Sequence, residues 1–491
     1  MSLILSLLLF GESLAEHKRA LLEAIANTND VKGAEAVEKI VSFDSKEGVE
    51  ALVSALGTIG RVSSPYEQER ERWYRVMEAN AYDPETKKWK GSIEKYKDAR
   101  AKHTEVSGKL ARLGTVSFAI GRGLGKMRSD AAVQEMLARL RPEGVAAVRA
   151  AIAGALAYAT QPEVGAAVAS QFRKEKDPGV RVALTEALRA HKNVDVLCEA
   201  LKDVHWPVRV AAAQGLGALR SREAIEPLIA AMGESDGRVR AEMNTALVAI
   251  TGVNKHADPA AWKSWWERNR ESFLAGTYKP EPAERGREAG GTTFYGLPVT
   301  SKKVVFVLDR SGSMAAAAKW KPEDVASGDA PNVSKPKGER KIDIAKYELK
   351  KVLALLPEGA EFNIVFYNSI QEPFSEKMVV LNRETRRRAI AFVDGIEPSG
   401  ATNISDALAR GMGFAGAVEK ASKAGVDTIY LLSDGMPTAG IVDVDEFCGH
   451  VAGANRLKKV SIHTVAIEPT ADSEKFMKRL AKENGGAYAK R

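Results

Sequence analysis

Apolar positions in residues 16–60 recur every three or four residues, which predicts amphipathic helices. Residues 61–113 are far more charged, and Tyr82-Asp83-Pro84 interrupts them, so we predict a pair of exposed helices there. From residue 300 onwards the pattern changes, because short apolar runs such as 304–308 alternate with helical segments. Strands that alternate with helices predict a mostly parallel sheet with right-handed crossovers.

The chain also repeats itself between the two kinds of pattern. Matching leucines are spaced by 32, 32, 28 and 31 residues, at Leu124, Leu156, Leu188, Leu216 and Leu247. A Val-Arg pair travels with each repeat. A fixed period near thirty residues, built from two short helices, is typical of an α-solenoid. We therefore predict that residues 16–274 form an all-α region.

The pattern at residues 258–274 predicts a helix that ends the repeats. Trp262, Trp265 and Trp266 fall on one helical face, and Asp258-Pro259 suits a helix start. A solenoid needs such a capping helix over its last repeat. Residues 275–291 are rich in glycine, proline and charge, which predicts a linker before a domain at 292–491.

One segment superficially matches a phosphate-binding loop, the Gly-Arg-Gly-Leu-Gly-Lys run at residues 121–126. A P-loop needs a glycine where this chain has Ile120 and a hydroxyl where it has Met127. The run also recurs in a later repeat, so we assign it to a repeat helix. We therefore predict no nucleotide binding.

Length and charge set only loose bounds. The 491 residues suffice for two or three domains, and the net charge of +8 permits an acidic or nucleic-acid partner without requiring one. Cys198 and Cys448 fall in different predicted domains, so a disulfide framework is not expected. No apolar run approaches the ~20 residues that span a bilayer, so we predict no transmembrane segment.

The N-terminus allows two interpretations. Residues 3–10 are apolar, and Ser13-Leu14-Ala15 resembles a cleavage site, so residues 1–15 have features of a signal peptide. No lysine or arginine precedes the apolar run, and the alternative is a first helix that packs on the next repeat. We favour export, to a periplasm or out of the cell, over a cytoplasmic location.

Acidic and hydroxyl side chains gather where the apolar strands end. Asp309, Ser311 and Ser313 follow the first such strand as Asp-x-Ser-x-Ser. Thr402 follows a glycine turn, and Asp434 follows a second apolar strand. Ligands of α/β proteins bind at the carboxyl ends of the strands. Carboxylate and hydroxyl oxygens suit a hard divalent cation.

Together these three stretches resemble the von Willebrand factor type A (VWA) domain and its metal-ion-dependent adhesion site. All five side chains of that motif match, at Asp309, Ser311, Ser313, Thr402 and Asp434. The resemblance implies a doubly wound, Rossmann-like α/β fold. It also implies that the two serines bind Mg²⁺ (or Mn²⁺) directly, that the threonine binds directly or through water, and that the aspartates act largely through water. A partner's Asp or Glu would fill the remaining coordination position.

Two features of this domain have no fixed counterpart in the motif. Arg310 either points away from the site or contacts the incoming carboxylate. Residues 315–340 lack periodicity and predict a long loop that could cover the site. Neither feature disturbs the five predicted ligands.

The repeats in turn resemble HEAT repeats of the short bacterial kind, on the Asp177-Pro178-x-Val-Arg turn and the helix that follows it. The predicted architecture is therefore multidomain. An all-α HEAT-like solenoid at 16–274, with a charged helical pair at 61–113 and a Trp-rich cap at 258–274, precedes a VWA domain at 292–491.

No nucleophile accompanied by a base emerges from the sequence. We interpret His463 as a hydrogen-bonded strand histidine, and Cys448 and His450 lack the further partners of a zinc site. We therefore predict a non-enzymatic, metal-dependent binding or scaffolding protein, with the solenoid as a second protein-binding surface. Two alternatives remain: an RNA-binding component like the Ro ribonucleoproteins, and a VWA helper subunit of an ATPase or chelatase-type complex.

Overall fold

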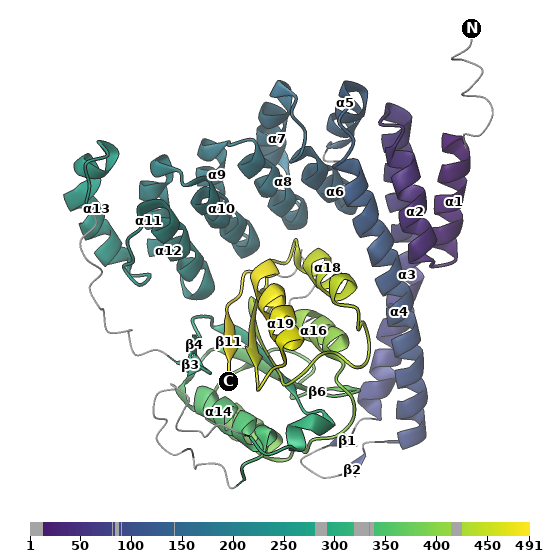
Figure 1. Ribbon diagram of the computed structural model, residues 1–491, viewed down its shortest axis with the longest axis vertical. Coiled ribbons are helices and arrows are strands. Elements are labelled where there is room, and N and C mark those ends of the chain that lie inside the picture. The colour runs from purple at the N-terminus through teal and green to yellow at the C-terminus, as the bar shows by residue number, and fades with distance from the viewer. Residues whose placement is uncertain are drawn as a thin grey trace. The chain divides into compact units, whose positions relative to one another are not determined.

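A computed structural model of the chain describes residues 13–80, 82–83, 88–89, 91–141, 143–279, 292–318, 333, 338–413 and 425–491. The chain forms two compact units, one up to Val196 and one from Leu197 to Arg491 (Figure 1). Residues 1–12 of the predicted signal segment and most of the predicted linker lie outside the described residues. Ser13 is the N-cap of the first helix.

The first unit is built from helices, as the apolar periodicity predicts. They are α1 (Leu14–Ala26), α2 (Asp30–Val41), α3 (Lys46–Ala79), α4 (Ile93–Leu124), α5 (Asp130–Arg139), α6 (Ala146–Leu156), α7 (Pro162–Lys174) and α8 (Pro178–Ala190). Helix α9 (Val194–Ala200) crosses into the second unit. Between α3 and α4 lies a short antiparallel pair, β1 (Tyr82–Asp83) and β2 (Lys88–Trp89).

Two helices occupy most of the charged range 61–113, but α3 begins before it and α4 ends after it. Helix α3 has 34 residues and α4 has 32, because both continue into the apolar part of the repeats. The glycine-rich run at 121–126 is the end of α4, with Gly125 as its C-cap. The run therefore belongs to a helix, as predicted, and no strand precedes it.

The second unit continues the helical pattern. Its helices are α10 (Trp206–Leu219), η1 (Arg222–Ala224), α11 (Ile225–Gly233), α12 (Gly237–Thr251) and α13 (Pro259–Leu274). The Val-Arg pairs stand near the starts of α6, α8, α10 and α12, and their arginines bind the preceding turn. Arg209 Nη1 donates to the carbonyl of Asp203 at 2.6 Å, and Arg240 Nε donates to that of Ser235 at 2.7 Å. The repeated dipeptide thus fastens each turn.

Helix α13 begins and packs as the sequence predicts. The Asp258 carboxylate accepts from two backbone amides of the first turn. Trp262 is fully buried and donates its Nε1 hydrogen to Asn244 of α12 at 2.8 Å, while Trp266 donates to Glu226 of α11 at 3.0 Å. Buried indoles with satisfied N–H groups stabilise the end of the repeat stack.

The α/β domain begins with a small ribbon, β3 (Thr293–Phe294) and β4 (Leu297–Pro298). Its main strands are β5 (Lys303–Asp309), β6 (Glu361–Tyr367), β7 (Gln371–Pro373), β8 (Val379–Val380), β9 (Thr428–Ser433), β10 (Ser461–Ala466) and β11 (Tyr488–Lys490). In the described part of the domain they form one sheet in the order β11-β10-β9-β5-β6-β7, and β8 also pairs with β6. Strands β7 and β8 run antiparallel to β6, and the other neighbouring pairs are parallel.

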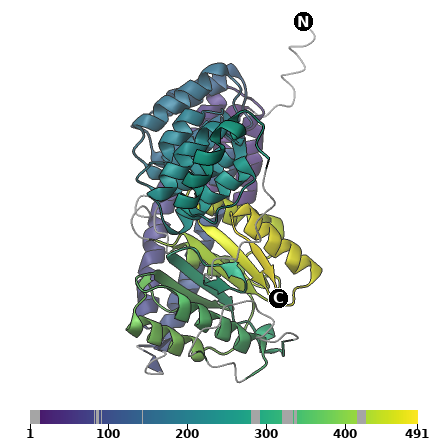
Figure 2. The same ribbon diagram turned by 90° about the vertical axis from the view of Figure 1, so that its left-hand side faces the viewer.

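Helices cover both faces of this sheet (Figure 2). Helices α14 (Lys341–Leu355) and α15 (Arg383–Asp394) contribute to the core on one face, against residues such as Phe306. On the other face lie α16 (Ile404–Gly413), α18 (Val444–Asn455) and α19 (Ala471–Glu483). Residues 414–424, which follow α16, lie outside the described residues. The doubly wound, mostly parallel fold is confirmed.

Within the second unit, α12 contacts the amino ends of the sheet strands. Arg238 is 5% exposed and donates Nη1 to the carbonyl of Asp427 at 2.7 Å and to that of Lys459. Asp236 pairs with Lys302 at 2.8 Å. These residues precede β9, β10 and β5, so the contact lies at the end of the sheet away from Asp309.

Candidate metal centre

Asp309 ends the central strand β5 and is fully buried. Its Oδ1 accepts from the Ser311 amide at 2.7 Å. Its Oδ2 accepts from Ser433 Oγ at 2.8 Å and from Tyr367 Oη at 3.4 Å. Since β5 lies between β6 and β9, both neighbouring strands supply a hydroxyl that fixes this carboxylate.

The two serines meet the second aspartate just beyond Asp309. Ser311 and Ser313 flank the start of a short 3₁₀ turn, η2 (Gly312–Ala315), and their Oγ atoms lie 3.1 Å apart. Ser313 Oγ donates to Asp434 Oδ1 at 2.7 Å. Direct hydrogen bonds therefore join three of the five predicted side chains, and Asp309 accepts from the backbone amide of Ser311 beside them.

Thr402 stands in a loop that is tied to both of these segments. The amide of Gly312 donates to the carbonyl of Gly400 at 3.0 Å, and Gly400 has a φ of +76°, which favours glycine. The amide of Thr402 donates to Thr438 Oγ1 at 2.9 Å, and its carbonyl accepts from the Thr438 amide at 2.9 Å. Thr402 is buried where the three predicted stretches converge.

Burial dominates the electrostatics of Asp309. It raises the pKa of this carboxyl from 3.8 to about 6, and the nearby charge of Asp434 adds to the rise. Hydrogen bonds from Ser311 and Ser433 oppose the shift. A bound cation would relieve the cost of keeping this charge in the protein interior.

The donor set fits a hard divalent cation. It contains only carboxylate and hydroxyl oxygens, and the described part of the chain holds no group of three or more His, Cys, Asp or Glu side chains arranged for a metal. Two adjacent corners of an Mg²⁺ octahedron lie roughly 3 Å apart when each metal–oxygen bond is about 2.1 Å. The 3.1 Å between the two serine hydroxyls matches that spacing.

Family models match both regions of the chain. Residues 333–490 match the von Willebrand factor type A domain, and residues 194–266 match HEAT repeats. The chain therefore contains HEAT repeats followed by a VWA domain. The matched VWA segment begins after Ser313, so the first three candidate residues rest on the structure and the motif.

The curated relatives match less than two fifths of this chain. Inter-alpha-trypsin inhibitor heavy chain H4 of Homo sapiens is 27% identical over 194 residues, which is 39% of this chain and 18% of the relative. Heavy chain H3 of Homo sapiens is 28% identical over 148 residues, 30% of this chain and 14% of the relative. The match thus spans less than a fifth of either relative.

Solved structures with detectable similarity include a mutant of the PilB minor pilin from Streptococcus sanguinis. It has a TM-score of 0.27 at 18% identity and covers 38% of this chain and 56% of the pilin. Manganese-loaded TRAP protein of Plasmodium vivax has a TM-score of 0.25 at 16% identity, over 37% of this chain and 62% of that protein. The VWA and HEAT domains support a role in protein interaction or adhesion.

Lys341 is a neighbour of the VWA site that the motif does not include. It is the first residue of α14, and its Nζ lies 3.0 Å from Asp434 Oδ2 and 3.7 Å from Glu468 Oε2. The sequence analysis also missed Tyr367 and Ser433 as partners of Asp309. For Ser433 a signal exists, because it directly precedes Asp434 at the end of β9.

Arg310 contacts residues other than the five candidate ligands. Its Nη2 pairs with Glu372 Oε2 of β7 at 3.0 Å, and Nη1 approaches the carbonyl of Glu397 at 3.4 Å. This pairing favours the first of the two predicted alternatives. The predicted loop at 315–340 is closed at its base by a bridge between Ala317 and Arg340, and residues 319–332 and 334–337 lie outside the described residues.

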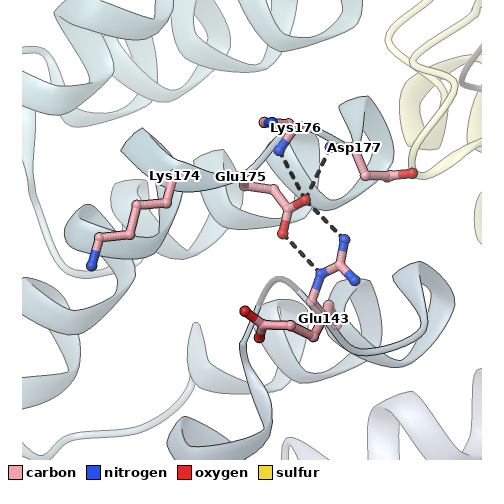
Figure 3. Close-up of a pocket in the computed structure, with 6 residues that line it drawn as sticks. Glu143, Lys174, Glu175, Lys176 and Asp177 are labelled. Atoms are coloured by element: carbon pink, nitrogen blue, oxygen red, sulfur yellow. Dashed lines mark hydrogen bonds and ion pairs between the residues drawn. The ribbon is translucent and has the colours of Figure 1, made fainter.

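A cleft in the first unit contains a buried ion pair between Arg149 and Glu175. It is lined by Glu143, Arg149, Lys174, Glu175, Lys176 and Asp177 (Figure 3). The Glu175 carboxylate accepts from Arg149 Nε and Nη2 at 2.9 Å each, and from the amides of Lys176 and Asp177 at 3.0 and 2.9 Å. Lys174 points away from Glu175 (Figure 3). With a further bond from Gln171 Nε2 at 3.3 Å, five hydrogen bonds satisfy this carboxylate within the protein.

His463 is a hydrogen-bonded strand residue, as the sequence predicts. Its ring stacks on Tyr430 with centroids 4.7 Å apart, and its Nδ1 accepts from the Ala487 amide at 3.0 Å. Burial lowers its pKa to about 4, so the ring is neutral at pH 7. This nitrogen is therefore already engaged by the sheet edge.

Proposed function

We propose that this protein binds other proteins in a cation-dependent manner, through Mg²⁺ or Mn²⁺ held in the VWA domain. The observation that supports this most is the hydrogen-bonded series Ser311, Ser313 and Asp434 beside the buried Asp309. In this proposal a partner protein presents an Asp or Glu to the cation. The HEAT repeats provide a second protein-binding surface.

The five residues divide the work by their chemistry. The hydroxyls of Ser311, Ser313 and Thr402 are neutral ligands, which leave most of the charge of the cation uncompensated. Asp309 and Asp434 hold the serines by hydrogen bonds and supply negative charge. A bound cation would act as a Lewis acid that accepts one more oxygen, for which a carboxylate is the strongest common protein ligand.

The proposed role is binding and not catalysis. Around the candidate site, the described side chains include hydroxyls and carboxylates but no histidine or cysteine placed beside a serine as a base. We also propose an exported location, on the apolar N-terminal run. No helix within the described ranges is long and apolar enough to cross a membrane.

Ser313→Ala is the variant that tests the cation site with least disturbance of the fold. Ser313 is exposed, so its truncation removes a ligand and the hydrogen bonds to Ser311 and Asp434 without leaving a cavity. We expect calorimetry of the full-length chain to show Mn²⁺ binding that this variant weakens by at least tenfold. Ser264→Ala, on an exposed position of α13, is the matched control and should bind as the wild type does.

Equal Mn²⁺ affinity in the wild type and in Ser313→Ala would contradict the assignment. A wild-type chain that binds no Mn²⁺ would reject the proposed function as a whole.

Salt and EDTA separate protein capture from RNA binding. A single coordinated carboxylate tolerates moderate salt and is released by EDTA, so we expect EDTA and Thr402→Ala each to abolish partner capture. RNA binding would instead fall steeply with salt, because each neutralised phosphate releases counterions, and EDTA would matter little. RNA that copurifies with the chain and survives EDTA would support the Ro-like alternative. Copurification with an ATPase that Ser313→Ala does not disturb would support the helper-subunit alternative.

A further inference from the structure

Lys341 lies where a lysine is electrostatically disfavoured. It is the first residue of the 15-residue helix α14, and the N-terminal end of a helix carries partial positive charge. Its side chain is only 11% exposed. A cation in such a place needs carboxylates around it. The carboxylates around Lys341 therefore indicate why a lysine is tolerated at this position.

Two carboxylates face the ammonium group. Nζ lies 3.0 Å from Asp434 Oδ2 and 3.7 Å from Glu468 Oε2, and the side chain of Asp434 is 2% exposed. The other oxygen of Asp434 accepts from Ser313 Oγ at 2.7 Å. One carboxylate group thus separates the ammonium of Lys341 from the hydroxyls of the candidate metal centre.

The backbone holds Lys341 in this position. Its amide donates to the carbonyl of Ala316 at 2.9 Å, which ties the start of α14 to the loop that carries the serines. The preceding Arg340 pairs with Asp343 and with Glu397, each at 2.9 Å. The ammonium is fixed beside the site by these contacts as well as by its own ion pairs.

We infer that Lys341 sets the ligand preference of the metal site: it weakens cation binding and strengthens the binding of an anionic ligand to the bound cation. This inference rests on the proposed cation binding. The ammonium neutralises part of the Asp434 charge and repels a divalent ion, which lowers cation affinity. The same positive charge attracts a carboxylate that approaches the ion. The two effects have opposite signs, and a purely structural lysine would not produce that combination.

Lys341→Met removes the charge and keeps most of the side-chain length. In calorimetry of the full-length chain we expect the variant to bind Mn²⁺ about tenfold more tightly than the wild type, since a repulsive charge close to the ion is gone. Acetate serves as the carboxylate probe, and the relaxation of water protons by bound Mn²⁺ reports its arrival. We expect the variant to need a several-fold higher acetate concentration.

Two further variants control for the loss of a lysine and for the charge balance. Lys350→Met removes another ion-paired lysine of α14, which binds Asp394 at 2.7 Å, and should leave both readings unchanged. Glu468→Gln removes the second carboxylate beside Lys341 and leaves its charge less compensated. We expect this variant to bind Mn²⁺ several-fold more weakly than the wild type.

The inference is overturned, and the proposed function stands, if Ser313→Ala weakens Mn²⁺ binding as expected but Lys341→Met binds Mn²⁺ no more tightly than the wild type. Unchanged acetate binding overturns it as well. If neither the wild type nor Lys341→Met binds Mn²⁺, the proposed function and the inference fall together.

Discussion

Asp309→Asn is expected to abolish Mn²⁺ binding and, in the metal-free protein, to raise stability at neutral pH. The buried carboxylate is costly, as the rise of its pKa to about 6 shows, and a neutral amide of the same shape avoids that cost. The hydroxyls that serve it have other acceptors, because Tyr367 Oη also reaches the carbonyl of Leu432 and Ser433 Oγ reaches that of Gly435. The substitution therefore leaves no hydroxyl unsatisfied.

The stability gain depends on pH in a defined direction. The folded protein binds the Asp309 proton more tightly than the unfolded chain does, so ionisation lowers the free energy of unfolding as pH rises from about 4 to about 6. A shift of about two pKa units corresponds to about 2–3 kcal/mol, fully present at pH 7. We expect the advantage of the variant to reach this size at pH 7 and to vanish near pH 4.

Chemical denaturation from pH 4 to 7.5, with and without Mn²⁺, measures both effects. Mn²⁺ should stabilise the wild type by mass action and leave Asp309→Asn unaffected. Asp472→Asn is the control, because Asp472 is 82% exposed and pairs with Lys475 across 3.9 Å. A variant that Mn²⁺ stabilises as much as it does the wild type would remove Asp309 from the site.

The sheet could be predicted from the sequence where its strands are buried on both faces. The apolar run before Asp309 and the run before Asp434 have no other stable place than the interior of a parallel sheet. Strand β6 (Glu361–Tyr367) is of the same kind, since every residue after its first is buried. Because strand ends define the ligand crevice, the same pattern also predicts that the candidate site residues lie close together.

Edge strands and contacts between distant residues could not be predicted from the sequence. Strand β7 has the sequence Gln-Glu-Pro, which carries no apolar alternation, and it forms only because it folds back on β6. Lys341 begins a helix that periodicity alone predicts, but its ion pair with Asp434 joins positions 93 residues apart. Such a contact depends on the fold and leaves no local pattern.

In the repeats, too, the sequence indicates local structure but not the contacts between distant residues. The recurring Val-Arg pair stands near the start of each of the helices α6, α8, α10 and α12. It did not predict what each arginine binds. All four arginines donate to carbonyls of the preceding turn, but Arg149 also forms a two-pronged ion pair with Glu175, 26 residues away. That difference makes one repeat more sensitive to charge removal than the others.

Glu175→Ala is therefore expected to destabilise the first unit by about 3–5 kcal/mol, because it leaves a buried guanidinium without its carboxylate. The side chains of Arg149 and Glu175 are 7% and 1% exposed. Burial alone would raise the pKa of Glu175, but the bonds from Arg149 and from the Asp177 amide outweigh it and lower the pKa. The stabilisation by this carboxylate is thus present at neutral pH and is lost as pH falls below about 4.5, the ordinary range of a glutamate.

The double variant Arg149→Met with Glu175→Leu separates two causes of destabilisation. One is the cost of leaving a buried charge unpaired, and the other is the loss of a pair that is itself stabilising. Desolvation of two charges offsets much of their attraction, so apolar side chains of similar volume should recover most of the stability lost in Glu175→Ala. Urea denaturation followed by circular dichroism measures the coupling between the two positions. It is carried out on the wild type, on the single variants Arg149→Met and Glu175→Leu, and on the double variant. A double variant no more stable than Glu175→Ala would mean that the amides of Lys176 and Asp177 need this carboxylate more than Arg149 does, since both donate to it.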